Sequence, residues 1–121
     1  MLATSGDALW CCSLFYAYDT ADMAFIVASD PETEHMRNAV NYPMVAGTVA
    51  LETKTVGKIQ GIQFAGEMIR ADSPKQQELY FKAFPYARVM NPILWCIRME
   101  RCKMTDNRFG FGKKLIWKRE S

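Results

Sequence analysis

Short apolar runs alternate with polar turns along the whole chain, and this pattern predicts a mainly β protein. The strands expected from it are residues 8–18, 23–28, 44–51, 58–70, 93–104 and 115–119. Residues 2–4 are typical of the end of a further strand, because the turn residues Ser5, Gly6 and Asp7 need a strand on each side. We therefore expect the native start of the protein to lie upstream of Met1.

Start and stop signals predict two helices between these strands. The segment 30–32, Asp-Pro-Glu, begins the first, because each of these residue types suits the free amides and the dipole at a helix start. Pro43 ends it after about three turns, since proline disfavours helical geometry at the preceding residue. Ser73 and Gln76 form a capping pair at the start of the second helix, and residues 86–90 can add a single turn.

The strand at 58–70 carries a signal of curvature. Ile62, Phe64 and Met68 share one face of it, while two glycines interrupt it. Glycines inside a strand mark a bulge, a bend at a barrel corner or the close approach of a ligand, and barrel curvature is the simplest of these explanations. With the strands in antiparallel order, we predict a single domain over residues 1–121, built as a six-stranded antiparallel β-barrel, closed or partly closed, with short helices.

Composition narrows the function classes. The chain has 121 residues, 50% of them hydrophobic, and a net charge of +2 that is too small to require nucleic acid as a partner. Without a long apolar run or room for a signal sequence, we expect no membrane partner and a cytoplasmic location. The cysteines at 11, 12, 96 and 102 fit neither a zinc ribbon nor a redox pair, so we expect reduced, mostly buried thiols.

Candidate chemistry gathers where the strand at 23–28 meets the first helix. Ser29, Thr33 and the only histidine, His35, lie at a strand end and a helix start, where polar groups can meet an anion. One histidine cannot provide the usual metal site of two or three histidines, so we expect no metal. A cysteine nucleophile paired with His35 has no local sequence signature to support it.

A second candidate region lies between residues 109 and 119. Its basic and aromatic side chains are Lys113, Lys114, Lys118, Arg119, Phe109, Phe111 and Trp117. Such a mixture can hold single-stranded nucleic acid, although a solvated strand face with an aromatic anchor is the simpler interpretation. A third interpretation places Lys113 and Trp117 beside a bound aromatic anion, such as a planar cofactor that carries a phosphate.

Four motifs resemble the small YhbP-like family of bacterial proteins. They are Thr33-x-His35, Gln60-Gly61-Ile62-Gln63-Phe64-Ala65-Gly66-Glu67, Thr105-Asp106-Asn107 and Phe111-Gly112-Lys113-Lys114-x-Ile116-Trp117. The resemblance covers nearly all of the chain. That family is similar in turn, at the level of the fold, to the pyridoxamine 5'-phosphate oxidase-like, FMN-binding split barrels. The resemblance implies a split β-barrel homodimer in which FMN, when present, lies in a cleft between the subunits.

The resemblance also implies a set of FMN-binding residues. These are Ser13, Ser29, Thr33, His35, Gln60, Gln63, Lys113 and Trp117. The group around His35 corresponds to the element that grips the phosphate, and the strand with Ser13 passes along the isoalloxazine ring. The strand from Gln60 to Gln63 approaches the ring from the other side, and Lys113 with Trp117 closes the site from the partner chain.

The implied function is that of a flavin-dependent oxidoreductase acting on a small molecule, with no catalytic residue assigned. True pyridoxamine phosphate oxidases clamp the phosphate with an arginine-rich strand and a Ser-Arg-Lys sequence, where this chain has Cys-Cys-Ser and Thr33-Glu34-His35. The arginine and histidine that hold pyridoxal phosphate in those enzymes are absent too. We therefore do not expect this chain to make pyridoxal phosphate. The alternative is a non-catalytic dimeric split barrel with a lost or different ligand.

Overall fold

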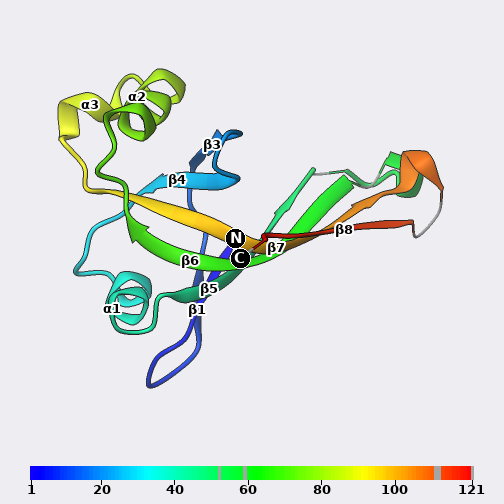
Figure 1. Cartoon of the computed structure of the whole chain (residues 1–121), viewed down its shortest axis with the longest axis horizontal. Helices are drawn as coiled ribbons and strands as arrows, with labels where there is room; N and C mark the ends of the chain where they lie inside the picture. The colour runs from blue at the N-terminus through cyan, green and yellow to red at the C-terminus, as the bar shows by residue number, and fades with distance from the viewer. Residues whose placement is uncertain (52, 59, 111–112, 121) are drawn as a thin grey trace.

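A curled antiparallel sheet forms most of the molecule (Figure 1). The computed structural model describes residues 1–51, 53–58, 60–110 and 113–120. The strands in this part of the chain are β1 Leu2–Thr4, β2 Trp10–Cys12, β3 Tyr16–Asp19, β4 Ala24–Ala28, β5 Met44–Ala50, β6 Gln60–Arg70, β7 Leu94–Asp106 and β8 Lys114–Lys118. Their order in the sheet is β2-β1-β5-β6-β7-β4-β3, with β8 paired to β7 off this path.

The mainly β, antiparallel class is confirmed, but the prediction of six strands is wrong, because the described residues form eight. The long strand expected at residues 8–18 is two strands, β2 and β3, which pair with different neighbours. Residues 2–4 add one more, since β1 pairs with β2 across the predicted turn.

The short link between β2 and β3 explains why the sheet curls. Only residues 13–15 join these two strands, so the link spans at most about 14 Å from residue 12 to residue 16. In a flat sheet of this order the same two strands would lie about 29 Å apart. The sheet therefore bends back on itself, and the chain crosses the gap between its edges. The result is a split barrel.

Three helices lie outside the sheet, with α1 (Glu34–Asn41) well separated from α2 (Pro74–Ala83) and α3 (Ala87–Met90) in Figure 1. The two 3-10 turns η1 (Val56–Lys58) and η2 (Asn107–Phe109) complete the described elements. Helix α1 has about two turns rather than the predicted three. Asp30 explains the difference, because its side chain accepts a hydrogen bond from the Glu32 amide (2.8 Å) and closes a turn before the helix begins.

Strand β4 divides the core into two clusters. Phe25 and Val27 pack into one cluster with Trp95, Ile97 and Met99 of β7, which share a face as predicted, while Met36 closes it from α1. The alternate β4 residues Ala24 and Ile26 point into the other cluster, together with Cys96 of β7. Tyr80 of α2 packs against them. Because both faces of β4 are buried, its sequence is apolar at every position.

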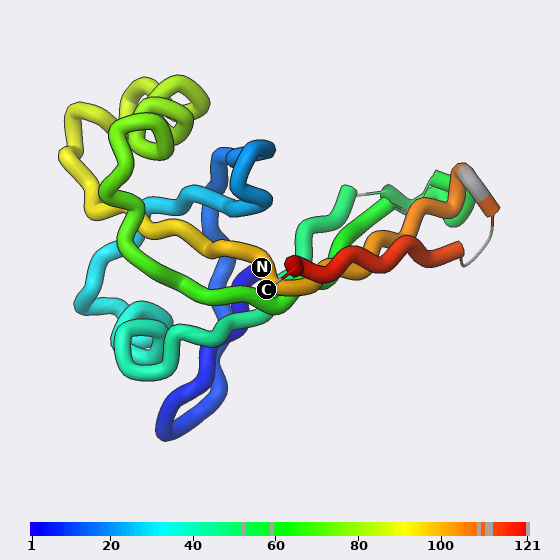
Figure 2. The backbone as a smooth tube through the Cα atoms, in the orientation of Figure 1, coloured from blue at the N-terminus to red at the C-terminus, as the bar shows by residue number. Residues whose placement is uncertain are grey.

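A β-bulge divides the long β6–β7 ladder. The register shifts between Ala65 and Gly66, and Glu100 is left without a partner on β6. A Cβ atom at Gly66 would clash with the Arg98 carbonyl oxygen, so the bulge explains one of the glycines in this strand. Beyond the bulge, residues 46–50, 60–65 and 101–106 and strand β8 project away from the barrel (Figure 2). We call these residues the arm, and the remainder the body.

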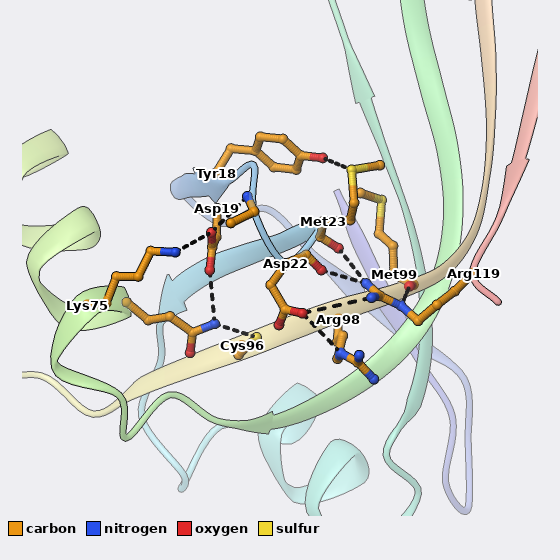
Figure 3. Close-up of polar contacts among 11 residues, drawn as sticks. Tyr18, Asp19, Asp22, Met23, Lys75, Cys96, Arg98, Met99 and Arg119 are labelled. Carbon is orange, nitrogen blue, oxygen red and sulfur yellow. Dashed lines mark hydrogen bonds and ion pairs between the residues drawn. The ribbon is translucent and has the colours of Figure 1, made fainter. Parts of the chain in front are cut away.

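One side chain ties the end of β8 back to the body (Figure 3). The Arg119 guanidinium donates to three backbone carbonyl oxygens, those of Met99 (2.7 Å), Asp22 (2.6 Å) and Met23 (3.2 Å). Its Nη1 also lies 3.8 Å from the Asp22 carboxylate. Arg119 therefore fixes the turn between β3 and β4 against β7.

The predicted capping pair at the start of α2 is wrong. Ser73 is the N-cap residue of α2, but neither side chain completes a capping box. Gln76 instead donates to the buried Asp19 carboxylate (3.3 Å) and to the Cys96 sulfur (3.5 Å). A buried carboxylate needs such donors, and this requirement outweighs the local capping pattern.

Candidate functional site

The polar corner at the start of α1 forms as the sequence predicts. Ser29 Oγ and His35 Nε2 lie 2.6 Å apart, and Thr33 Oγ1 lies 3.3 Å from the same nitrogen. The strand end is held in place because Trp95 Nε1 donates to the Ser29 carbonyl oxygen at 2.9 Å. Burial lowers the pKa of His35 below its usual value, so the imidazole is neutral at pH 7.

The hydrogen bonds around His35 indicate which atom carries the ring proton. Thr33 Oγ1 donates its own proton to the Asp30 carbonyl oxygen at 2.7 Å, so towards His35 it can only accept. Nε2 is then protonated and donates to both hydroxyl oxygens. This arrangement leaves the Ser29 hydroxyl proton free for an anion, since the described residues offer it no other acceptor. It also leaves the ring's lone pair on Nδ1, so Nε2 cannot serve as a base towards these hydroxyls.

The first turn of α1 adds donors and one repulsive charge. The N-cap residue Thr33 makes no side-chain capping bond, so the first amides of the helix are available to an anion. Glu34 is the first helical residue, is exposed and carries a negative charge close to those amides. The corner can therefore bind an anion through hydrogen bonds from a hydroxyl and backbone amides, with little contribution from charged side chains.

A second candidate site is an apolar groove of about 650 Å³ along the inner face of the arm. Its lining combines aromatic rings from the body with aliphatic and sulfur-containing side chains from the arm: Tyr16, Tyr18, Phe25, Met99, Cys102, Met104, Leu115 and Trp117. Gln60 and Asp106, which face each other across β6 and β7, provide polar side chains at the groove. The shape and composition suit a flat, mostly apolar ligand that is oriented by a few hydrogen bonds.

The predicted residues on the arm do not share one face. Gln60 and Trp117 line the groove, whereas Gln63 lies on the opposite face of β6 and is exposed. Lys113 precedes β8 and borders a separate small hollow with Met104 and Asp106. Successive residues of a strand point to opposite faces, so Gln60 and Gln63 cannot contact the same ring.

A single chain therefore does not gather the predicted residues into one site. Ser29, Thr33 and His35 lie between β4 and α1 on the body, and the exposed Ser13 lies in the link between β2 and β3. Gln60 begins β6 on the arm, and Trp117 lies in β8, where it packs against the edge of the body cluster. The described pockets connect neither group to the other.

Sequence reasoning missed the aromatic wall of the groove. Tyr16 and Tyr18 alternate on β3 with buried Ala17, and both are about 40% exposed on the side that faces the groove. This alternation is a signal of a strand with one open face. The alternation was missed because residues 8–18 were interpreted as one continuous strand.

The described residues give little support to a cysteine nucleophile or to a metal site. Burial raises the pKa of the Cys12, Cys96 and Cys102 thiols, so these three are protonated at pH 7 and are weak nucleophiles. All four cysteines are free, but the prediction of mostly buried thiols is wrong, because only Cys96 is buried, Cys12 and Cys102 are half-buried and Cys11 is exposed. The described part of the chain has no cluster of three metal-binding side chains. None of its helices has the length and apolar character needed to cross a membrane.

Solved structures with the same fold include cofactor-binding proteins. A heme binding protein from Mycobacterium smegmatis aligns with a TM-score of 0.78 at 16% identity, over 97% of this chain and 51% of that protein. A pyridoxamine 5'-phosphate oxidase-related, FMN binding protein from Nostoc punctiforme aligns with a TM-score of 0.64 at 14% identity, over 98% and 79%. At these identities the similarity establishes the split-barrel fold.

Sequence relatives are much closer. A UPF0306 protein from Cronobacter sakazakii is 48% identical over 118 residues, which is 95% of this chain and 82% of the relative. The UPF0306 protein YhbP from Escherichia coli is 40% identical over 116 residues, 93% of this chain and 79% of the relative. No family model matches the chain. Identity at this level over almost the whole chain shows that it belongs to the UPF0306 family, which includes the YhbP proteins.

Proposed function

We propose that this protein binds FMN between two copies of the chain and supports two-electron redox chemistry on a small molecule. The observation that carries the proposal is the apolar groove of about 650 Å³ on the arm, lined by aromatic rings and by Gln60 and Trp117. Its volume lies within the range of small-molecule sites, which is about 300–1,000 Å³. The similarity to an FMN binding protein of the same fold supports this choice of ligand.

The groove fits the flavin ring. An isoalloxazine is flat and largely apolar, with polar atoms along one edge, and it needs a slot with a few hydrogen-bond partners. The Gln60 side chain can both donate and accept at such an edge. The Trp117 indole offers a flat face, which is held by the Arg119 guanidinium carbon 5.4 Å from its ring centroid.

The corner at α1 fits the phosphate. The free Ser29 proton and the first amides of α1 can donate to phosphate oxygens, with His35 holding the Ser29 oxygen in place. Because Glu34 opposes the charge and His35 is neutral, these donors provide orientation more than affinity. Most of the binding free energy would then come from the ring.

A second copy of the chain would bring the two parts together. Within one chain the groove and the corner are separate, and three aliphatic side chains beside the groove are exposed to solvent: Leu51 (54%), Leu115 (52%) and Ile116 (79%). An exposed apolar surface of this kind is typical of an interface. In the proposed homodimer, the corner of one subunit faces the arm of its partner, and the flavin lies between them.

FMN, when bound, supplies the redox chemistry by accepting and releasing a hydride equivalent. The residues of the chain bind and orient it. Gln60 and Trp117 fix the plane of the ring, Ser29 and the α1 amides fix the phosphate, and the aromatic wall excludes water. No side chain is assigned to proton transfer, because, among the described groove residues, burial raises the pKa of the Cys102 thiol and the Arg108 guanidinium lowers the pKa of the Asp106 carboxyl.

Absorbance and fluorescence test the proposal directly. Protein purified without added cofactor should show flavin absorption or quench the fluorescence of added FMN, and FMN should raise its melting temperature. We expect Gln60→Ala and Trp117→Ala each to weaken FMN binding about tenfold, and Ser29→Ala to weaken it less. Tyr86→Ala is the matched aromatic control, because Tyr86 is 90% exposed on the N-terminal side of α3.

The alternative is a non-catalytic dimer with a lost or different ligand. It predicts no flavin absorption, no quenching and an unchanged melting temperature, and that result would remove the FMN proposal. Heme is the specific different ligand to test, because the half-buried Met23 and Met104 line the groove and a structural neighbour is a heme binding protein. A Soret band on addition of hemin, lost in Met104→Leu, would favour heme over FMN.

A further inference from the structure

The face of the arm opposite the groove has a distinct composition, and we call it the outer face. Strand alternation places these residues on it: Ala46, Thr48 and Ala50 on β5; Gly61, Gln63 and Ala65 on β6; Arg101, Lys103 and Thr105 on β7; Lys114, Ile116 and Lys118 on β8. Gly61, Thr105 and Ile116 also border the groove at its edges. Small neutral residues cover the β5–β6 half, and cations cover the β7–β8 half. None of these residues is acidic.

The cations of the outer face have no carboxylate partner among the described residues. In other regions six arginine and lysine residues form ion pairs with carboxylates, as Arg98 does with Asp22 at 3.3 Å. Among the described residues, no carboxylate pairs with Arg101, Lys103 or Lys118, and Lys114 donates to the Thr105 hydroxyl (2.9 Å). The outer face is therefore positively charged with no internal counterion.

Register places two of these charges directly opposite each other. Arg101 pairs with Lys118 across the β7–β8 ladder, and Lys103 follows Arg101 on the same face of β7. Like charges at directly opposed positions destabilise a sheet. A doubly charged anion lying between Arg101 and Lys118 would offset both charges at once, whereas a singly charged anion would offset only one.

The same region is hollowed. A depression of about 310 Å³ is lined by Gln63, Arg101 and Lys103, with Ala46 and Ala65 as its small residues and Ile116 on one side. The Arg101 guanidinium can donate two parallel hydrogen bonds to one phosphate group, and the Gln63 amide is a neutral donor beside it. The alanines leave room for an organic group attached to the phosphate.

We propose that the outer face of the arm binds the phosphate dianion of a small phosphorylated compound. Arg101 and Lys118 contact the charge from two strands, Lys103 and Gln63 complete the donor set, and the alanine surface of β5 and β6 accommodates the organic group. The site lies on the other side of the sheet from the proposed flavin groove, so it does not depend on FMN binding. It gives the arm a second ligand of different chemistry.

The outer face does not combine charge with stacking as a single-strand nucleic-acid site would. Trp117 lies in the groove on the inner face, whereas Lys114 and Lys118 point to the outer face. One strand of nucleic acid could not contact both sets. Phosphodiesters also carry a single charge each, so they match the opposed pair of Arg101 and Lys118 less well than a monoester does.

The test uses backbone amide NMR of the FMN-free protein, with glycerol 2-phosphate as the probe at constant ionic strength. We expect shifts confined to β6, β7 and β8, and at least about tenfold weaker binding in Arg101→Ala and in Lys118→Ala. Lys82→Ala is the matched control, because it removes the same charge from an exposed position on α2. Equal weakening in Lys82→Ala, or an absence of shifts, would overturn the proposal.

Charge state gives an independent readout. Binding of glycerol 2-phosphate should strengthen about tenfold between pH 5 and pH 7, because a phosphate monoester gains its second charge near pH 6. Sulfate, which keeps two charges throughout, should bind the same residues without this pH dependence. Dimethyl phosphate and acetate should bind much more weakly. If dimethyl phosphate binds as well as the monoester, the outer face is a general anion surface, and the proposal is wrong.

Discussion

The body and the arm are parts of one sheet, yet they differ in how far their apolar side chains are buried. In the body, Ile26, Met36 and Met99 are at most 2% exposed. On the arm, Leu115 and Ile116 are 52% and 79% exposed, although they belong to a regular strand that pairs with β7. The body therefore derives its stability from its own packing, whereas the arm has the hydrogen bonds of a sheet without a core of its own.

Two methionines on the inner face of β7 provide the strongest test of this contrast. Met99 is 2% exposed in the body and Met104 is half-buried on the arm. We expect Met99→Ala to lower the free energy of unfolding by about 2–5 kcal/mol, and Met104→Ala by less than about 1 kcal/mol, as measured by denaturant unfolding. An equal loss in both variants that does not depend on protein concentration would contradict this contrast between the body and the arm.

The junction between the two regions is the next most sensitive position. Gly66→Ala should destabilise the protein by about 1–3 kcal/mol, because its new methyl group meets the backbone of Arg98 with no room to move. Gly57→Ala is the control, since nothing lies within 4 Å of the Cβ position there. Thermal unfolding of the two variants compares them. Similar melting temperatures would show that the bulge relaxes freely.

Arg119 should matter most where the arm joins the body. Arg119→Gln removes a guanidinium that donates to three carbonyl oxygens, at a cost of about 1–2 kcal/mol. Hydrogen exchange should show faster exchange in β8 and in the β3–β4 turn, with the core of the body unchanged. Arg88→Gln, on an exposed pair with Glu78, should leave all of these rates unaltered. Uniformly faster exchange would contradict a local role.

Acid should produce the smallest effect, and it should originate in the body. The pKa of His35 is lowered by burial, so between that lowered value and about pH 6.5 the unfolded chain binds more protons than the folded one. Stability from this residue is complete above pH 6.5 and is lost as the pH falls through the window. Unfolding curves of His35→Gln should lose this part of the pH dependence. An identical pH profile in the variant would exclude His35 as the cause.

Much of the body could be predicted because its signals are local. The apolar run of β4, the prolines that bound α1 and α2, and the shared face of Trp95, Ile97 and Met99 each depend on neighbouring residues in sequence. The corner of Ser29, Thr33 and His35 was found for the same reason, since a strand end and a helix start lie six residues apart.

The arm could not be predicted in the same way, because its properties depend on register between distant strands. Gln60 and Gln63 appear as neighbours in the sequence, but they face opposite sides of the sheet. The opposition of Arg101 and Lys118 follows only from the β7–β8 pairing. Residues 8–18 were misread as one strand because nothing in their composition marks the point where the chain crosses between sheet edges. Phe111, part of the predicted basic and aromatic region, lies outside the described residues.

The Arg119 contacts also bear on the order in which the molecule can fold. The hydrogen bonds from Arg119 to Asp22 and Met23 join residues 97 and 96 positions apart in the chain. Contacts of such long separation form late, because the entropy of closing the intervening loop must be offset by structure that already exists. During synthesis, β3 and β4 would emerge well before the residue that fixes their turn. The turn should therefore remain loosely held until the last strand pairs with β7, and the final step of folding joins the arm to the body.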